Sequence, residues 1–179
     1  MILTLVRHGE VLKEYQGKYN GHLDIPLSEK GKEQAKELAQ TLQASEFDLI
    51  YCSSLLRARE TIAAFDVKPI FSEKLREKSW GKHEGKGFSE IEAEGIHYEN
   101  FEQWINALDG EDMHKYIADL REYFYETILK QDAHNILIVT HAGVIKTLLH
   151  IVYNISLEEA FAKELPYASY ITLDTTKFR

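Results

Sequence analysis

The sequence predicts an α/β protein, a three-layer αβα sandwich built on a mostly parallel sheet with an antiparallel edge strand. Short runs of apolar and β-branched residues, such as 2–6 and 135–140, are typical of buried strands. Longer stretches with apolar residues at helical spacing alternate with these runs, which favours right-handed βαβ units. The chain has no internal repeat, heptad array or low-complexity tract that would indicate another architecture.

In the first part of the chain, the strand at 2–6 leads into a polar, glycine-containing loop over 9–27. Ser28 is a typical N-cap residue, and apolar residues recur after it at helical spacing. We therefore expect a helix over 29–44. The other elements expected in this half are a strand at 47–51, a helix at 55–65 and a short strand at 68–71.

The segment at about 72–112 is the part of the chain least like a hydrophobic core, because it combines five glycines and two tryptophans with many charges. We interpret it as a small helical insertion, or lid, with short helices near 88–94 and 98–108. After it the sequence predicts a long helix at 113–129, a buried strand at 135–140, an apolar helix at 144–153 and an edge strand at 169–174.

Length and charge narrow the classes of partner. The 179 residues suit a single domain over 1–179. With 21 Lys plus Arg and 29 Asp plus Glu, the net charge of −8 argues against nucleic acid and anionic membranes as partners. The first apolar run is too short for a signal peptide or a membrane span, and the single Cys52 requires no oxidising compartment. We expect a cytoplasmic protein, with a homodimer among the oligomeric states left open.

The candidate catalytic residues lie just after the ends of predicted strands. Arg7-His8-Gly9-Glu10 follows the first strand, Ser53 to Arg59 follows the second, and Thr140-His141-Ala142-Gly143 follows the most apolar one. Ligands of such sheets gather at the carboxyl ends of the strands. Glycines there allow the backbone to come close to an anion, and a helix that begins near Ala142 offers free N–H groups that can bind one.

Two imidazoles and two guanidiniums repel one another unless an anion lies between them, and a phosphoryl group fits that place. The pattern therefore points to phosphoryl transfer, in which one histidine attacks phosphorus and the second stabilises the oxygens. A carboxylic acid must then protonate the leaving alkoxide and later activate water. The candidates for that acid are Glu73, Glu77 and Glu84. The remaining histidines are not spaced as zinc ligands, so no metal site is expected.

Several stretches in order along the chain resemble the histidine phosphatase superfamily, also called phosphoglycerate-mutase-like. They are Leu5 to Glu10, Gly21 to Ser28, Ser53 to Thr61, Leu75-Arg76-Glu77 with Trp80-Gly81, His83-Glu84-Gly85 and Val139 to Gly143. Within the superfamily the chain is most similar to small members of the α-ribazole-phosphatase type.

The resemblance implies a role for each matching residue. His8 would become phosphohistidine, Glu77 would be the proton donor, and Arg7, Arg57 and His141 would complete the phosphate pocket. The residues expected to contact substrate are Gly9, Asn20, Gly21, Glu84, Ala142 and Gly143. The family pattern implies no metal and no organic cofactor.

Two positions depart from the family pattern, which often has Thr just after the Arg-His-Gly-Glu run and Asn three residues later. This chain has Val11 and Glu14 there. A carboxylate in place of the amide would repel phosphate. Either Glu14 points away, or Asn20 supplies the amide donor, or the substrate carries a positive group.

The leading hypothesis is a phosphatase that acts on a small phosphorylated metabolite, α-ribazole phosphate being one candidate. One alternative is a phosphoglycerate mutase primed by 2,3-bisphosphoglycerate, which must exclude water. Others are a phosphoprotein phosphatase and a non-catalytic module that binds a phosphorylated ligand.

Overall fold

The computed structural model describes residues 1–178 and is built around a five-stranded sheet with the strand order β3-β2-β4-β1-β5. The first four strands in this order run parallel, and β5 lies antiparallel to β1 at one edge. The strands are Ile2–Arg7 (β1), Leu49–Ser53 (β2), Ile70–Ser72 (β3), Asn135–Thr140 (β4) and Tyr170–Asp174 (β5). The predicted fold class is confirmed, antiparallel edge strand included.

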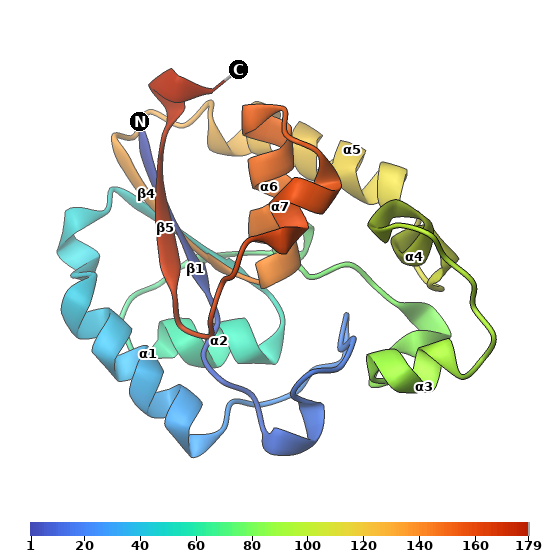
Figure 1. Cartoon of the computed structure of the whole chain (residues 1–179). Coiled ribbons are helices and arrows are strands. Elements are labelled where there is room, and N and C mark those ends of the chain that lie inside the picture. The colour runs from blue at the N-terminus through green and yellow to red at the C-terminus, as the bar shows by residue number, and fades with distance from the viewer. Residues whose placement is uncertain (179) are drawn as a thin grey trace.

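Helices cover both faces of the sheet. Figure 1 shows α1 and α2 on one side of the strands and α5, α6 and α7 on the other, which makes three layers. The helices are Glu29–Thr41 (α1), Leu56–Ala63 (α2), Phe88–Glu92 (α3), Phe101–Ala107 (α4), Met113–Tyr123 (α5), Ala142–Tyr153 (α6) and Leu157–Ala162 (α7). The short helices α3 and α4 lie in the segment between β3 and α5, as the sequence predicts.

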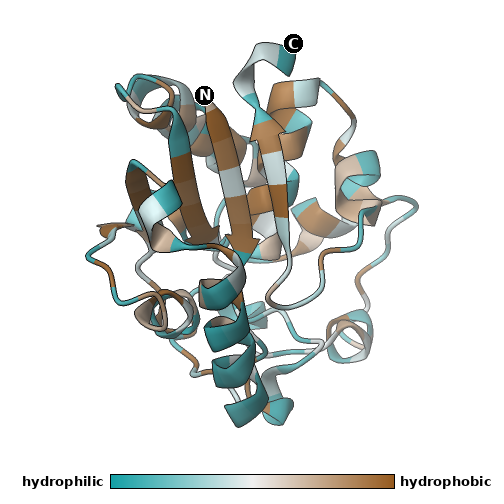
Figure 2. Cartoon of the chain, turned by 90° about the vertical axis from the view of Figure 1, so that its left-hand side faces the viewer, coloured by the Kyte–Doolittle hydropathy of each residue, from teal (hydrophilic) through white to brown (hydrophobic). Residues whose placement is uncertain are grey.

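Side chains that alternate along each strand divide the interior into two cores. Leu5 and Ile138 belong to a large core that includes residues of α5 and α6. Val6 and Val139 belong to a smaller core with α1 and α2, where Ile62 is buried. Figure 2 shows apolar strands in the interior and a polar surface on α1, the helix in front. Burial of each large apolar side chain contributes about 1.5–3 kcal/mol relative to its exposure.

The observed elements differ from the expected ones mainly at their ends. The helix expected over 29–44 stops at Thr41, since a short 3-10 turn forms over Ala44–Glu46. The helix expected over 113–129 is α5 followed by a π-helical turn at Phe124–Ile128. Helix α7 was not expected from the sequence. No helix within residues 1–178 has both the length and the apolar character needed to cross a membrane.

Candidate active site

The register of the sheet brings His8 and His141 together. Arg7 at the end of β1 pairs with Thr140 at the end of β4. His8 and His141, the next residue after each strand, therefore leave the sheet at the same level. The N–H of His8 donates to the Thr140 carbonyl at 3.0 Å, and the centroids of the two imidazole rings lie 5.2 Å apart. The sequence prediction that these two residues share one edge of the sheet is therefore met by the structure.

The ring of His8 is oriented for attack through Nε2. Its Nδ1 lies 2.8 Å from the Gly9 carbonyl oxygen, which can only accept, so Nδ1 carries the hydrogen. Burial, and then the positive charges of Arg57 and Arg7, hold the pKa of His8 well below its ordinary value of 6.5. The neutral ring therefore has its lone pair on Nε2 near neutral pH.

His141 caps the start of α6 and is completely buried. Its Nε2 lies 2.7 Å from the Ser53 hydroxyl at the end of β2. Burial is the main cause that holds the pKa of His141 well below 6.5, followed by the charge of Arg57. Nδ1 is also buried but has no hydrogen-bond partner among residues 1–178. When the Ser53 hydroxyl donates to Nε2, Nδ1 of the neutral ring carries a hydrogen that can be donated to an oxyanion.

Arg7 and Arg57 are held by main-chain carbonyls rather than by carboxylates. The Arg57 side chain, from α2, donates to the carbonyls of Gly21 and Leu23 at 2.8 Å each, and the residue is only 3% exposed. Arg7 donates to the Leu165 carbonyl, and its guanidinium lies 4.0 Å from the centre of the Tyr167 ring. Burial lowers the pKa of both guanidiniums, but arginine stays charged in proteins. Their charges are thus fixed in place without an anionic side chain bound to either.

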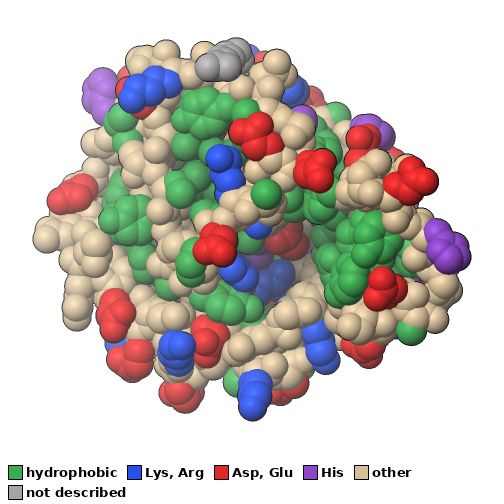
Figure 3. All heavy atoms as spheres, viewed as in Figure 1, with side chains coloured by type: hydrophobic (Ala, Val, Ile, Leu, Met, Phe, Trp, Pro, Cys, Tyr) green, Lys and Arg blue, Asp and Glu red, His purple; other side chains and the backbone are tan. Residues whose placement is uncertain are grey.

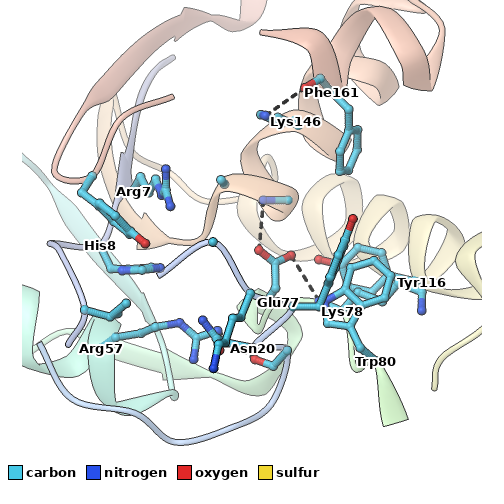
Figure 4. Close-up of a pocket in the computed structure, with 18 of the residues that line it drawn as sticks. Arg7, His8, Asn20, Arg57, Glu77, Lys78, Trp80, Tyr116, Lys146 and Phe161 are labelled. Carbon is cyan, nitrogen blue, oxygen red and sulfur yellow. Dashed lines mark hydrogen bonds between the residues drawn. The ribbon is translucent and has the colours of Figure 1, made fainter. Parts of the chain in front are cut away.

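Glu77 reaches the site from the segment after β3. Its Oε2 accepts from the N–H of Gly143 at 3.1 Å, and Oε1 accepts from the N–H of Lys78 at 3.3 Å. A Cβ at Gly143 would overlap the Glu77 carboxyl, so glycine at this position lets the carboxyl lie directly against the backbone. Figure 4 shows Glu77 beside α6, with Arg7, His8 and Arg57 to one side of it.

Arg7, His8, Arg57 and Glu77 line a cavity of about 260 Å³. His141 is not itself in the wall, although its ring lies beside that of His8. Figure 3 shows the cavity as a hollow in which Lys and Arg side chains are visible, although the chain as a whole is acidic. The predicted residues Asn20, Gly21, Ala142 and Gly143 also lie in its wall. Asn20 donates to the Tyr15 carbonyl through Nδ2.

Two residues predicted to contact substrate are placed elsewhere. Glu84 is not in the cavity wall; its Oε1 accepts from the backbone N–H groups of His22 and Trp80. The N–H of Gly9 donates to the Thr61 hydroxyl at 3.0 Å. The sequence motif identified both residues, but it could not show that their hydrogen-bonding groups are used inside the protein. Glu84 joins two loops, and Gly9 orients His8.

The departures from the family pattern are also accommodated. Glu14 is exposed and is not in the cavity wall, so it points away from the site. Val11 is buried and lies in the wall. Of the three alternatives raised by the sequence, the first is therefore observed. Asn20 lies in the wall, but its Nδ2 already donates to the Tyr15 carbonyl.

Sequence reasoning missed further residues of the wall. They are Val11, Gly17, Lys18, Tyr19, Lys78, Trp80, Met113, Tyr116, Lys146, Phe161 and Tyr167. Lys146 had a signal in the sequence, because it is the one Lys or Arg within the otherwise apolar helix Ala142–Tyr153. Phe161 and Tyr167 had none, since they come from α7 and the loop before β5. Within residues 1–178, no group of three or more His, Cys, Asp or Glu side chains is arranged to hold a metal ion.

Comparison with known proteins identifies relatives over nearly the whole chain. Residues 3–179 match the family model described as the histidine phosphatase superfamily (branch 1). An adenosylcobalamin/α-ribazole phosphatase of Salmonella typhimurium is 33% identical over 83% of this chain and 78% of its own length. A 2,3-bisphosphoglycerate-dependent phosphoglycerate mutase of Gloeobacter violaceus is 27% identical over 93% of this chain and 82% of its own.

A solved structure shares the same architecture. The crystal structure of the α-ribazole phosphatase from Shigella flexneri superposes with a TM-score of 0.84 at 28% identity. The superposition covers 99% of this chain and 93% of the other.

Proposed function

The chain belongs to the histidine phosphatase superfamily, branch 1, and we propose that it hydrolyses small phosphomonoesters through a phosphohistidine formed on His8. Relatives of about one third identity are named as phosphatases, which supports a phosphoric monoester hydrolase. The observation that supports the proposed route best is the Nδ1 hydrogen bond of His8 to Gly9, because it leaves Nε2 unprotonated.

In the first step, Nε2 of His8 attacks phosphorus while the bond from phosphorus to the ester oxygen breaks. Arg7 and Arg57 neutralise charge on the three other oxygens of the phosphoryl group, and the neutral ring of His141 donates a hydrogen bond to one of them through Nδ1. Glu77 donates a proton to the departing oxygen, which leaves as an alcohol. The buried, carbonyl-held guanidiniums support this assignment, because they need not reorganise as the charge develops.

In the second step, the carboxylate of Glu77 accepts a proton from water, and the water oxygen attacks phosphorus. The bond between phosphorus and Nε2 breaks, which regenerates neutral His8 and releases inorganic phosphate. The same carboxyl thus acts first as acid and then as base. Its hydrogen bond to Gly143 supports this role by fixing the carboxyl beside the site.

The names of the relatives indicate which substrates to assay first. We propose α-ribazole phosphate as one candidate, because relatives of about one third identity are named for it. A relative named as a phosphoglycerate mutase makes 3-phosphoglycerate the second. Isomerisation to 2-phosphoglycerate without net release of phosphate would assign the chain to the mutases instead.

We also propose that the protein acts in the cytoplasm. Cys52 is its single cysteine and is buried, and burial raises the pKa of its thiol. The thiol therefore stays protonated and unreactive, which supports a protein that needs no disulfide.

Replacement of the nucleophile tests the proposed reaction. We expect wild type to release phosphate from p-nitrophenyl phosphate and from phosphorylated metabolites, and His8→Ala to lose at least about a hundredfold in kcat. The control is His134→Ala, which removes an exposed imidazole far from the cavity wall and should retain wild-type rates. Equal rates for wild type and His8→Ala would exclude His8 as the nucleophile.

A further inference from the structure

The cavity contains more positive charge than a phosphomonoester needs. Its wall includes the cations Arg7, Lys18, Arg57, Lys78 and Lys146, against the single carboxylate of Glu77. Arg7 and Arg57 suffice to match a phosphoryl dianion. The lysines lie in a protein whose net charge is −8, so their concentration here is not a property of the whole surface.

Lys78, the buried lysine of the wall, has its charge balanced by the protein. Lys78 is 2% exposed, and its ammonium lies 4.2 Å from the centre of the Trp80 ring. Burial lowers the pKa of Lys78, while the negative charges of Glu111 and Asp112 are the main influences that raise it. This ammonium therefore has acidic neighbours of its own and requires no ligand.

Lys146 lacks such compensation. Its Nζ donates to the Phe161 carbonyl at 2.9 Å and lies 5.8 Å from the centre of the Phe161 ring. It forms no ion pair with any side chain of residues 1–178. Burial, and then the charge of Arg7, lowers the pKa of Lys146, and only Glu77 opposes this. An ammonium has three donors, and the protein uses one of them.

The position of Lys146 places it beside the alcohol part of a substrate. A proton donor must lie next to the leaving oxygen, so the alcohol extends from Glu77 into the rest of the cavity. Figure 4 shows Lys146 and Phe161 above Glu77 and Tyr116 and Trp80 to its right, while His8 and Arg57 lie on the opposite side. The bond to the Phe161 carbonyl holds the ammonium toward α7, away from His8.

We propose that Lys146 binds a second anionic group, a carboxylate or a phosphate, on the alcohol part of the substrate. The inference rests on the proposed function and narrows its substrate class to phosphomonoesters that carry a further negative charge. Of the two candidates above, it favours 3-phosphoglycerate over α-ribazole phosphate, whose nucleoside part is neutral. The Phe161 ring, whose centre lies 5.8 Å from Nζ, adds apolar surface near the ammonium, and an ion pair is stronger where the surroundings are less polar than water.

Matched substrates test this assignment. Glycerol 3-phosphate and 3-phosphoglycerate differ in that a hydroxymethyl group of the first is a carboxylate in the second, and glycerol 1,3-bisphosphate adds a phosphate instead. We expect wild type to favour at least one of the doubly anionic esters over glycerol 3-phosphate by about tenfold or more in kcat/KM. The preferred ester then shows whether the second group is a carboxylate or a phosphate.

Replacement of the ammonium should remove that preference selectively. Lys146→Met retains the length and apolar stem, and we expect about a tenfold to hundredfold loss of kcat/KM for the favoured ester. The rate for glycerol 3-phosphate should stay within about threefold. Lys146→Arg should restore most of the preference, because it returns the positive charge. Lys163→Met removes the same charge from an exposed position just after α7 and should alter neither rate.

Other outcomes overturn the inference. Equal losses for charged and neutral esters would mean that Lys146 serves the transferred phosphoryl group or the fold. A preference unchanged in Lys146→Met, or absent from wild type, would mean that Lys146 binds no second anion. These results leave the phosphatase assignment intact as long as glycerol 3-phosphate is hydrolysed by wild type and not by His8→Ala. Hydrolysis that persists in His8→Ala would refute the proposed nucleophile, whatever Lys146 does.

Discussion

His8 and His141 are held as neutral imidazoles inside the protein, and this has a consequence for stability. As pH falls through 6.5, both histidines bind protons in the unfolded chain. In the folded chain they bind protons only at lower pH, because their pKa values are held well below the ordinary one. The unfolded state therefore binds more protons in this window, and stability must fall as pH decreases.

We predict that the free energy of unfolding falls between pH 6.5 and 5.5 by up to about 1.4 kcal/mol per pH unit for each of the two histidines. Urea unfolding at pH 7.5, 6.5 and 5.5 measures it. His8→Asn and His141→Asn should each weaken the pH dependence, whereas His134→Asn, at an exposed position, should not. Equal stability of wild type at all three pH values would contradict the prediction.

Gly143 offers a test of the carboxyl at Glu77. A methyl group at Gly143 would overlap that carboxyl, which must then move from the hydrogen bond it now makes. We predict that Gly143→Ala lowers kcat about tenfold to hundredfold for alkyl phosphates, and less for p-nitrophenyl phosphate, whose leaving group needs little protonation. Gly87→Ala is the control, since its nearest contact of 3.4 Å leaves room. Equal losses on the two substrates would indicate general damage to the site.

Residues that directly follow a strand could be placed at the site from the sequence alone. His8 and His141 are such residues, because strand order alone determines where they lie. The side chain of Glu84 was assigned wrongly to the cavity, because a motif identifies a carboxylate but not the N–H groups that it accepts from. Tyr167 and Phe161 could not be predicted, since their segments reach the cavity only through tertiary packing.

At the level of elements, the start of α1 packs directly on the backbone that follows β1. A Cβ on Gly9 would lie 2.6 Å from the Gly31 carbonyl oxygen, and one on Gly31 would overlap the Glu10 carbonyl. Ser28 strengthens the junction, because its hydroxyl accepts from the N–H of Gly31 and donates to the Glu10 carboxylate. This contact fixes the position of the Gly9 carbonyl, which accepts from Nδ1 of His8 and so orients the imidazole ring.

We therefore predict that Gly31→Ala destabilises the protein by about 1–3 kcal/mol or more, since the new methyl group would overlap the backbone of Glu10, which cannot move aside as a flexible side chain can. It should also lower kcat, because the Gly9 carbonyl must shift. Thermal unfolding and phosphate release measure the two effects. Lys32→Ala, at an exposed position of the same helix, should leave both unchanged within error. Wild-type stability of Gly31→Ala would contradict the proposed tight contact.

Strands and long helices were predictable because hydrophobic periodicity marks them, as for β4 at Asn135–Thr140. Helix α7 was missed because only six residues form it. Its start does carry a local signal: Ser156 accepts from the N–H of Glu159, and Ser with Glu three residues later is a typical helix start. The π-helical turn after α5 leaves no comparable mark in the sequence.

For the whole molecule, the site depends on segments that meet only in the folded state. Arg7 and His8 follow β1, Arg57 belongs to α2, Glu77 follows β3 and His141 follows β4. The two arginines are held by main-chain carbonyls and not by carboxylates, so repulsion between their positive charges lowers the stability of the folded state. An oxyanion that binds among them should offset this repulsion and should have little affinity for the unfolded chain.

This argument predicts that inorganic phosphate stabilises the native protein. At one hundred times its Kd, a ligand of the native state adds about 2.7 kcal/mol, which corresponds to an increase in Tm on the order of 5–10 °C for a chain of this size. Arg57→Met should abolish the increase, because it removes a buried cation of the site. Arg59→Met is the matched control: it lies two residues away in α2, pairs with Asp24 at the surface and should keep the full increase. Equal increases in both variants, or none in wild type, would mean that phosphate does not bind among these segments, since only a ligand held by Arg57 distinguishes the two arginines.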